Sequence, residues 1–370
     1  MESDPWGWWR SQMPITDRFA YFDHAAVGPL PGPTADQLRW FADSASVHGD
    51  TDWPKWNGHL GRLRRLYADW VGADASEIAL VPNTTFGINV VAEGIDWQPG
   101  DNIVLPGGEF PSNRLPWLQQ QQHGVEIREI DSPGGVVDMD AIADAIDERT
   151  RIVTASWVGF STGYRIDVDH LVRIAHAKRA LVFLDAIQGL GMFPLNLEKT
   201  PVDFLAADGH KWMLGPEGAG MMFIRRAHLE KLRFRGVGWG SVQLSGDFGS
   251  QTTSLKDDAS RYESGSMNLS GMMALHSSMK IFAAIRSSHG EHAIANRVLE
   301  LVQHADNELR GVGATPRTPP VPHRSGILTF DVPEVAPDQI RTACLELDVV
   351  VMVVVRVNCG ADASPAATDD

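Results

Sequence analysis

Residues 203–218 read DFLAADGHKWMLGPEG, an apolar run that leads through Gly209 and His210 to Lys211 and a glycine-rich turn. Lysine is rarely buried unless it is paired or used. Burial lowers the pKa of the amine and makes it a better nucleophile for a carbonyl carbon. Lys211 is therefore a candidate for covalent chemistry, although a lysine that extends its charged end into solvent has the same local pattern.

Short apolar runs alternate with helical patterns on both sides of this segment, which predicts a mostly parallel α/β sheet. The apolar runs cover residues 102–106, 125–130, 151–156, 180–184 and 220–224, and helical stretches cover 60–71, 88–95, 139–146 and 170–177. Ligands of such sheets bind outside the carboxyl ends of the strands. Asp185 directly follows one of these runs, which places it at the predicted site, although an aspartate there can also simply form a turn.

The rest of the chain predicts a second, smaller unit. Residues 235–254 are rich in Gly, Ser and Thr and mark a boundary, after which a helical stretch runs from 271 to 309. A strand at 326–332, a helix at 338–347 and an apolar β-branched run at 349–357 follow. We expect an N-terminal arm (1–30), a large domain (31–250), a small α+β domain (251–358) and a disordered tail (359–370).

Composition limits the function classes. The 370 residues include 32 Lys and Arg against 47 Asp and Glu, a net charge of −15, which disfavours nucleic acid as a partner. The two cysteines, Cys344 and Cys359, form no metal-binding or redox pattern. Neither a signal peptide nor an apolar stretch long enough to cross a membrane is evident, so we predict a cytoplasmic protein without a membrane partner.

Residues 83–87, NTTFG, precede an apolar helical stretch. Free backbone N–H groups and the helix dipole favour an anion at such a helix start. Asn and Thr are also good ordinary caps, so the pattern fits a helix N-terminus with or without a ligand.

Several motifs together resemble, in the right order, the class V aminotransferase-fold enzymes that depend on pyridoxal 5′-phosphate (PLP). This family includes cysteine desulfurases and isopenicillin N epimerase-like proteins. The resemblance runs from about Tyr21 to Arg356. It implies the PLP-dependent transferase fold type I, which is aspartate-aminotransferase-like, with a mostly parallel seven-stranded sheet and a smaller α+β domain.

Three residues would carry the chemistry by this resemblance. Lys211 would hold PLP covalently and move the Cα proton of the substrate, with His210 directly before it. Asp185 would pair with the pyridine nitrogen, and its carboxylate would keep that nitrogen protonated so that the ring accepts electrons.

The resemblance assigns further contacts around the cofactor. Thr84 and Thr85 would lie in the phosphate-binding turn, Gln188 near the ring O3′, and Phe110 on the ring face. Ser266, in the segment ESGS at 263–266, would reach the phosphate of a neighbouring subunit, which implies a homodimer with shared active sites. Arg356 would bind the carboxylate of the substrate, a task that suits a bidentate guanidinium.

The sequence also departs from the family pattern. Phe110 stands where cysteine desulfurases usually have a histidine, and it can stack but cannot transfer a proton. Trp157 replaces an asparagine that many relatives place near O3′, and Asp208 replaces a serine that often contacts the phosphate. A carboxylate cannot donate to phosphate unless it is protonated. Cys359 does not match the spacing of a desulfurase nucleophile clearly, and a cysteine without function is the simpler interpretation.

Alternatives remain at this point. GFSTG at 159–163 fits the G-x-S-x-G pattern of serine hydrolases, with Ser161 followed by Asp185 and His210 in the expected chain order, but residues 164–167 separate it from the next helix. Residues 289–292, HGEH, lack the H-E-x-x-H order of a zinc site, so we predict no metal. A non-catalytic scaffold with the PLP fold would need neither Lys211 nor Asp185.

We therefore predict a PLP-dependent enzyme that acts on the amino group or Cα of a small amino acid. Transamination, epimerisation and C–S cleavage all begin with the same proton removal, and fold-level similarity does not decide among them. Cysteine desulfurase, a non-catalytic scaffold and a serine hydrolase that uses Ser161 are the alternatives.

Overall fold

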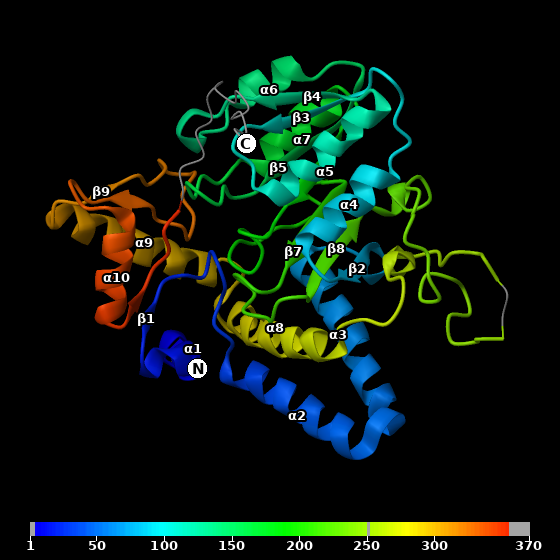
Figure 1. Ribbon diagram of the computed structural model, residues 1–370, viewed down its shortest axis with the longest axis horizontal. Helices are drawn as coiled ribbons and strands as arrows, with labels where there is room; N and C mark the ends of the chain where they lie inside the picture. The colour runs from blue at the N-terminus through cyan, green and yellow to red at the C-terminus, as the bar shows by residue number, and fades with distance from the viewer. Residues whose placement is uncertain (1–3, 250–251, 355–370) are drawn as a thin grey trace, which may run out of the picture.

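The computed structural model describes residues 4–249 and 252–354, and its centre is a seven-stranded sheet with helices on both faces (Figure 1). The strand order is β2-β8-β7-β6-β5-β3-β4. The strands are β2 (Ile78–Val81), β3 (Asn102–Pro106), β4 (Glu126–Ile130), β5 (Thr150–Ser156), β6 (Leu181–Asp185), β7 (Phe204–Asp208) and β8 (Gly220–Ile224). Within this sheet β8 alone runs antiparallel to its neighbours. The predicted mostly parallel seven-stranded sheet is confirmed.

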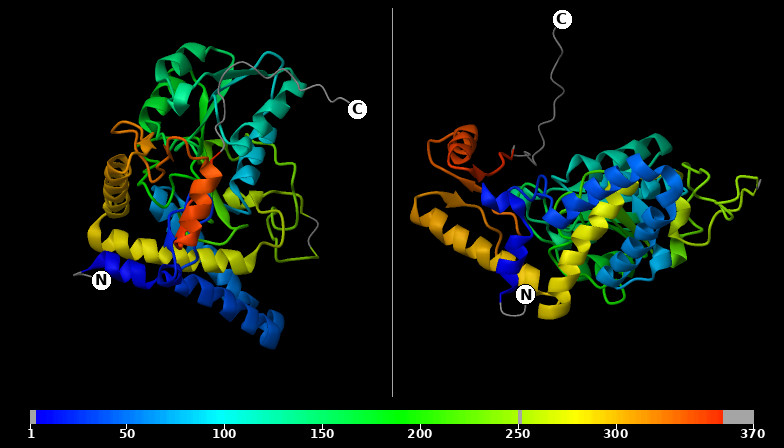
Figure 2. Two further views of the ribbon diagram at one scale, coloured as in Figure 1. Left: turned by 60° about the vertical axis from the view of Figure 1, so that its left-hand side comes forward. Right: turned by 90° about the horizontal axis from the view of Figure 1, so that it is seen from below.

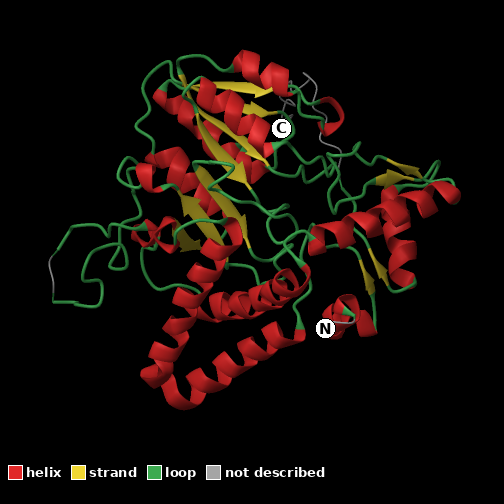
Figure 3. Cartoon of the chain, turned by 180° about the vertical axis from the view of Figure 1, so that it is seen from behind, coloured by secondary structure: helices red, strands yellow, loops and turns green. Residues whose placement is uncertain are grey.

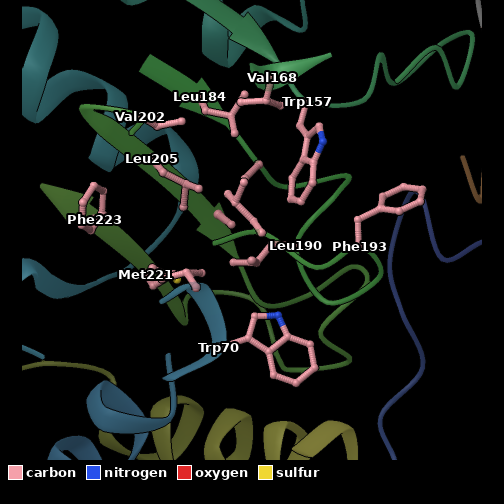
Figure 4. Packing of buried hydrophobic residues seen from close by; sticks show 14 of the residues in the cluster. Trp70, Trp157, Val168, Leu184, Leu190, Phe193, Val202, Leu205, Met221 and Phe223 are labelled. Atoms are coloured by element: carbon pink, nitrogen blue, oxygen red, sulfur yellow. The ribbon is translucent and has the colours of Figure 1, made fainter. Parts of the chain in front are cut away.

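In the central strands, alternate side chains belong to two separate hydrophobic cores, as the two-residue period of a strand requires. In β6, for example, Val182 and Leu184 face one core and Phe183 faces the other. Figure 4 shows part of the first core, where Leu184 and Leu205 extend from neighbouring strands. Because both faces are buried, these strands read as continuous apolar runs.

The helices divide between the two cores. Residues of α3 (Trp53–Val71), α6 (Met139–Ala145), α7 (Val168–Ala177) and α8 (Leu269–His289) belong to the first core, and those of α4 (Thr84–Gly94) and α5 (Leu115–Leu118) belong to the second. Figure 3 shows these helices on either side of the strands from behind. Helix α2 (Gly32–His48) packs along α8.

The two ends of the described chain meet beside the sheet. Strand β1 (Ala20–Tyr21) pairs in parallel with β11 (Val349–Val350), close to α1 (Pro5–Ser11) and α10 (Pro337–Glu346) (Figure 2). Helix α9 (Ala293–Gly311) and the antiparallel pair β9 (Thr315–Pro316) and β10 (Phe330–Asp331) complete this region. The N-terminal arm therefore bridges the C-terminal region and the residues around the sheet.

Two sequence predictions need correction here. The helical stretch predicted at 271–309 is two helices, because α8 ends at His289 and the next residue, Gly290, has a φ of 90° that favours glycine. The strand predicted at 326–332 is reduced to the two residues of β10. The apolar run at 349–357 is described up to residue 354, and within that part only β11 is a strand. Residues 355–357 lie outside the described residues.

The predicted division of the chain at residue 250 stays a prediction. Helix α8 lies beyond that point, and its Met272 and Phe282 belong to the same core as Leu63 of α3. Among the helices in residues 4–249 and 252–354, none combines the length and apolar character that crossing a bilayer requires. The predicted tail at 359–370 lies outside the described residues.

Candidate active site

Lys211 lies in a tight loop just after β7, at the carboxyl edge of the sheet. The backbone N–H of Leu214 donates to the carbonyl of Lys211 at 3.1 Å, which closes a turn. Gly28 of the N-terminal arm lies against the same loop and donates its N–H to the carbonyl of His210 at 2.6 Å. A Cβ at position 28 would lie 2.2 Å from the Lys211 carbonyl oxygen, so only glycine allows this approach. The arm therefore covers the loop that carries Lys211.

The Lys211 side chain is buried, with 9% of its surface exposed. Burial lowers the pKa of its amine, whereas the negative charges of Asp185, Asp208 and Asp23 raise it. Burial is the larger effect, which favours the neutral, nucleophilic form of the amine. This burial excludes the alternative, left open by the sequence, that Lys211 extends its charged end into solvent.

Asp185 is the last residue of β6, the strand next to β7. Its side chain is buried, and burial raises the pKa of its carboxyl to about 6, against the opposing effects of the Ile187 N–H and the Lys211 charge. The Ile187 N–H donates to Oδ1 at 3.1 Å. A buried carboxyl with so little compensation would be stabilised as a carboxylate by a positive partner.

The side-chain amide of Gln188 is held by one hydrogen-bond donor and one hydrogen-bond acceptor. The indole N–H of Trp212 donates to Oε1 at 2.8 Å, and Nε2 donates to the carbonyl of Ala25 at 2.9 Å. An indole N–H can only donate and a carbonyl can only accept. The orientation of the amide is therefore defined, and Nε2 keeps one further N–H.

Phe110 faces the amine of Lys211, with Nζ 5.5 Å from the centroid of its ring. The ring is 41% exposed and packs edge-on against Phe160. The residue before it, Glu109, is partly buried and accepts hydrogen bonds from the backbone N–H and the hydroxyl of Ser156. Burial raises the pKa of Glu109 to about 7, although these hydrogen bonds oppose the rise. The segment that carries Phe110 is thus attached to the end of β5.

The predicted phosphate turn forms the N-terminus of α4. The side chain of Asn83 caps the helix by accepting from the N–H of Phe86 at 2.8 Å. The Thr84 hydroxyl oxygen accepts from the backbone N–H of Asp208 at 2.9 Å, which leaves the hydroxyl hydrogen free to donate. The Thr85 hydroxyl donates to that of Ser112 at 2.7 Å. The helix start therefore lies directly against the end of β7.

The same edge of the sheet carries a buried acidic group beside a histidine. Asp208 Oδ1 accepts from the N–H of Gly209 at 2.7 Å. Its Oδ2 lies 3.0 Å from Nδ1 of His210, which is buried but not aligned for a hydrogen bond. The structure thus brings together seven of the predicted site residues: Thr84, Thr85, Phe110, Asp185, Gln188, His210 and Lys211.

Two predicted site residues are not part of this group. Ser266 is exposed on the loop 263–266, which begins at Glu263. Glu263 holds Arg64 through two hydrogen bonds of 2.6 and 3.0 Å and also accepts from the Leu80 N–H at 2.8 Å. Arg356 lies outside the described residues, as does Cys359.

Two residues of the arm belong to the site but were missed in the sequence. Asp23 is close enough to Lys211 to raise the pKa of its amine. His24 stacks on the Trp212 indole at 5.7 Å, and burial lowers its pKa to about 4. The sequence does carry a signal for these two residues. Small residues and Gly28 directly follow the acid and the histidine, and a segment with small side chains can approach a ligand closely.

Ser161 does not form a nucleophile elbow. Val158 and Arg165 pair as an antiparallel bridge, and Gly163 donates its N–H to the carbonyl of Gly159 at 2.8 Å. The G-x-S-x-G segment is therefore a hairpin, whereas a serine hydrolase needs the serine at a sharp strand-to-helix turn. Helix α7 begins only at Val168.

These features define the class of the protein. A lysine after one parallel strand and an aspartate after the adjacent strand, both buried and electrostatically coupled beside a helix N-terminus, are the arrangement of the fold type I PLP-dependent enzymes. The chain belongs to the aminotransferase class-V family, which it matches over residues 20–359. It is thus an enzyme of the class V fold whose cofactor is PLP.

Curated relatives agree with this family. The chain is 32% identical to a probable cysteine desulfurase of Methanothermobacter thermautotrophicus over 275 residues, which cover 73% of this chain and 68% of the relative. It is 25% identical to a probable cysteine desulfurase of Pyrococcus abyssi over 359 residues, covering 92% of this chain and 86% of the relative.

Solved structures confirm the fold. The apo structure of the cysteine desulfurase from Thermococcus onnurineus superposes with a TM-score of 0.82 at 24% identity, covering 92% of this chain and 86% of that one. The cystine C–S lyase C-DES, in complex with its product cysteine persulfide, superposes with a TM-score of 0.82 at 20% identity, covering 93% and 92%. The prediction of fold type I is therefore confirmed.

Proposed function

We propose that Lys211 binds PLP covalently and that the enzyme removes the Cα proton of a small amino acid. The observation that carries this proposal is the pairing of Lys211 with Asp185 at the ends of adjacent strands, where both are buried and each shifts the pKa of the other. PLP, when bound, supplies an electron sink for the negative charge that develops at Cα. The chain then has to hold the ring, bind the substrate and move the proton.

The residues present fit the ring end of PLP. The Asp185 carboxyl, with its raised pKa, gains from a positive partner, and a protonated pyridine nitrogen is such a partner. The unused N–H of Gln188 is a donor for the ring O3′. Phe110 offers an aromatic face on the side of the Lys211 amine.

The residues at the phosphate end fit with one exception. The start of α4 and the free hydroxyl hydrogen of Thr84 favour an anion. His210 adds an imidazole at the same edge. Asp208 is the exception, because an ionised carboxylate repels a phosphate.

Lys211 is the proton-transfer group in this proposal. Its amine faces Phe110, which has no proton to give or take. Burial lowers the pKa of Lys211, which favours the neutral form that a base needs. Arg356 remains the proposed partner of the substrate carboxylate.

We also propose a homodimer in which Ser266 reaches the phosphate in the partner subunit. Ser266 is exposed and therefore accessible to a partner subunit. The loop that carries it is held in place at its start, where Glu263 binds Arg64 and the Leu80 N–H. The neighbouring segment 236–249 extends away from the sheet (Figures 1 and 3) and exposes large apolar side chains, including Trp239, Leu244 and Phe248. Exposed apolar surface of this kind favours association. The cytoplasm stays the predicted compartment.

Borohydride trapping tests the cofactor site. Protein incubated with PLP should be yellow, lose its colour on reduction and carry a phosphopyridoxyl group on the Lys211 peptide in mass spectra. Lys211→Ala should remain unlabelled. Lys178→Ala should be labelled like the wild type, because Lys178 caps the end of α7 just before β6 and so precedes the end of that strand opposite to Asp185. A protein that stays colourless with added PLP would contradict the proposal and favour a non-catalytic scaffold.

Cysteine desulfuration is the second candidate. The names of the relatives from Methanothermobacter and Pyrococcus favour it. Incubation with cysteine should then release sulfide and alanine in equal amounts in the presence of a thiol. Racemisation or keto-acid formation from other amino acids, without sulfide from cysteine, would favour the epimerase or transaminase outcome instead.

A further inference from the structure

Helices α3 and α8 pack against each other (Figure 1), and a pair of histidines joins them. Nδ1 of His59 lies 3.1 Å from Nδ1 of His276, and the two rings meet edge to face with their centroids 5.2 Å apart. His276 is buried and His59 is partly buried. In a hydrogen bond between two ring nitrogens, one donates its proton and the other accepts with its lone pair. The bond therefore requires that at least one of the two rings stays neutral.

The charges around the pair oppose its protonation. Arg62 follows His59 by three residues on α3, and Lys280 follows His276 by four residues on α8. Burial is the largest cause that lowers the pKa of both rings, and the positive charges of Arg62 and Lys280 lower both further. The charge of His59 also lowers the pKa of His276, which falls to about 4. The folded protein thus resists protonation of the pair at pH values where a free histidine takes up a proton.

Acidic groups that could offset these charges are engaged elsewhere. Helix α2 packs along α8 and meets the neighbour of His276 through an uncharged group, because the Ser277 hydroxyl donates to the Pro33 carbonyl at 3.1 Å. Carboxylates of the adjoining segments are bound by basic partners or exposed: Asp36 is bound by Arg39, Asp52 by Lys55, Glu263 by Arg64 and Glu291 by Arg286, and Asp43 and Asp69 are exposed. Among the described residues, no carboxylate raises the pKa of either ring.

A metal ion is the other partner that two imidazoles at this distance could share. Within residues 4–249 and 252–354, no third histidine, cysteine or carboxylate completes a group of metal ligands. Arg62 and Lys280, whose charges reach both rings, would also repel a cation. The contact between the rings is therefore a hydrogen bond and not part of a metal site.

Helix α8 supports the active-site loop at residues 209–215 from both sides of His276. The residue before it, Leu275, fills the space beside the two glycines that begin and end the loop, where a Cβ would come within 2.7 Å of Leu275 Cδ1. Two residues after it, the Ser278 hydroxyl donates to the carbonyl of Leu214 at 2.6 Å. A displacement of α8 at His276 would therefore reach the loop directly.

We propose that the hydrogen bond between His59 and His276 is an acid-sensitive clasp, which holds α8 against α3 while one ring is neutral and opens when both rings are protonated. Two imidazolium rings would each present an N–H to the other, so they would repel and separate. Opening frees α8 from α3 and withdraws its support from loop 209–215. The opening itself does not depend on the cofactor, whereas its effect on PLP binding rests on the proposed function of Lys211.

The direction of the pH dependence follows from the lowered pKa of the two rings. In the unfolded chain each ring takes up a proton near pH 6.5, about the ordinary pKa of histidine. The folded state binds that proton only at lower pH, so the stability that the neutral pair contributes is fully present above about pH 6.5 and is lost as the pH falls toward 4. For His276 alone, a fall from pH 7 to pH 5 should raise the unfolding equilibrium constant about twentyfold.

His276→Asn removes the titrating group and keeps an amide at the position of Nδ1, which can still bond to His59. From pH 7 to pH 5, the unfolding constant of the wild type should rise about twentyfold more than that of this variant. Urea unfolding of the full-length protein with PLP, followed by circular dichroism, measures both constants. His304→Gln is the matched control, because His304 is an exposed histidine of α9, and it should behave like the wild type. The same pH dependence in His276→Asn and the wild type would overturn the proposal.

Hydrogen exchange of the unaltered protein tests the opening if His276→Asn does not fold. After correction for the intrinsic effect of pH on exchange, the amides of α8 around His276 should lose protection between pH 7 and pH 5. Those of α4, which contains no histidine, should keep theirs. The absorbance of bound PLP should fall over the same pH range. Full protection of α8 at pH 5 would overturn the proposal, whereas protein that forms no adduct on Lys211 at pH 7 would refute the proposed function and leave the exchange experiment valid.

Discussion

The indole N–H of Trp212 donates a 2.8 Å hydrogen bond to Oε1 of Gln188, so the residue that follows Lys211 fixes the amide that would face the cofactor. Trp212 is itself held in place, because it stacks on His24 and lies against Gly326, where a Cβ would come within 2.3 Å of its ring. The indole thus links the loop that carries Lys211 to both the N-terminal arm and the C-terminal region. Substitution of Trp212 should therefore disturb the site without touching Lys211.

Trp212→Phe should reduce kcat about tenfold, because Gln188 can then rotate and lose the orientation of its free N–H, and should cost about 1 kcal/mol of stability for the lost hydrogen bond. Steady-state kinetics and urea unfolding measure the two effects. Trp97→Phe is the matched control, since the Trp97 indole makes a 2.7 Å bond to the Ala92 carbonyl in α4, away from Lys211. Equal losses of kcat in both variants would show that Trp212 has no special role.

Asp185→Ala should lower kcat by about three orders of magnitude or more, roughly 4 kcal/mol of activation free energy, because it removes the proposed negative partner of the ring nitrogen. The folded structure should persist, which circular dichroism checks. Glu109→Gln is a useful control, because Glu109 is another carboxyl with a raised pKa in the same region but is bonded to Ser156. Near-normal turnover of Asp185→Ala would mean that the cofactor lies elsewhere.

Glu263→Gln should destabilise the protein by about 3 kcal/mol, because it leaves the partly buried Arg64 guanidinium without the carboxylate that it binds. If Ser266 acts in the partner subunit, the variant should also bind PLP more weakly, since Glu263 fixes the start of that loop. Thermal unfolding and PLP titration measure the two effects. Glu300→Gln removes an exposed pair with Arg297 and should change neither.

The sequence predicted the sheet well because most of its strands, for example β2, β3, β7 and β8, are buried on both faces. The bounds of β3 and β8 match the predicted apolar runs, since turn formers and polar residues delimit them. The prediction of one long helix at 271–309 was wrong, because the polar residues 286–292 (RSSHGEH) also fit a solvated helix face and a single glycine does not by itself mark a helix end. Local pattern therefore identified the elements but not every boundary.

The candidate site was predictable only where motifs carry it. Lys211 and Asp185 follow apolar strands, and this position brings them together without knowledge of side-chain packing. The roles of Trp212 and Asp23 were missed, because they depend on the N-terminal arm closing over a loop nearly two hundred residues away in the chain. Such contacts between distant segments leave no periodic signal in either of them.

Phe110→His should introduce a titrating group beside Lys211. In the wild type, the pH dependence of kcat/KM should not include a group at position 110, because a phenyl ring does not ionise. The variant should add a transition near pH 6.5, about the ordinary pKa of histidine, and should raise C–S cleavage if that reaction needs a second proton donor. Phe110→Tyr serves as a control that keeps the ring but adds no group titrating near neutrality. An unchanged pH profile in Phe110→His would show that position 110 does not face the reacting atoms.

The buried Asp203 gives the clearest pH dependence of stability. It accepts from His176 and His228 at 2.8 and 2.7 Å and from the Val182 N–H at 2.8 Å. Against the opposing effect of burial, these contacts lower the pKa of its carboxyl to about 2. The value in the unfolded chain is about 3.9. The folded state therefore holds the proton less tightly, and the carboxylate contributes stability that is fully present above about pH 4 and is lost as the pH falls toward 2.

Asp203→Asn should accordingly lower the free energy of unfolding at pH 7 by about 2.5 kcal/mol, the equivalent of a pKa difference of about two units. The gap between wild type and variant should narrow steadily from pH 4 to pH 2, because the wild-type carboxylate is then protonated in both states. Urea unfolding at several pH values measures the gap. A difference that stays constant down to pH 2 would show that the asparagine disturbs packing, and no difference at pH 7 would show that the two histidines do not stabilise the carboxylate.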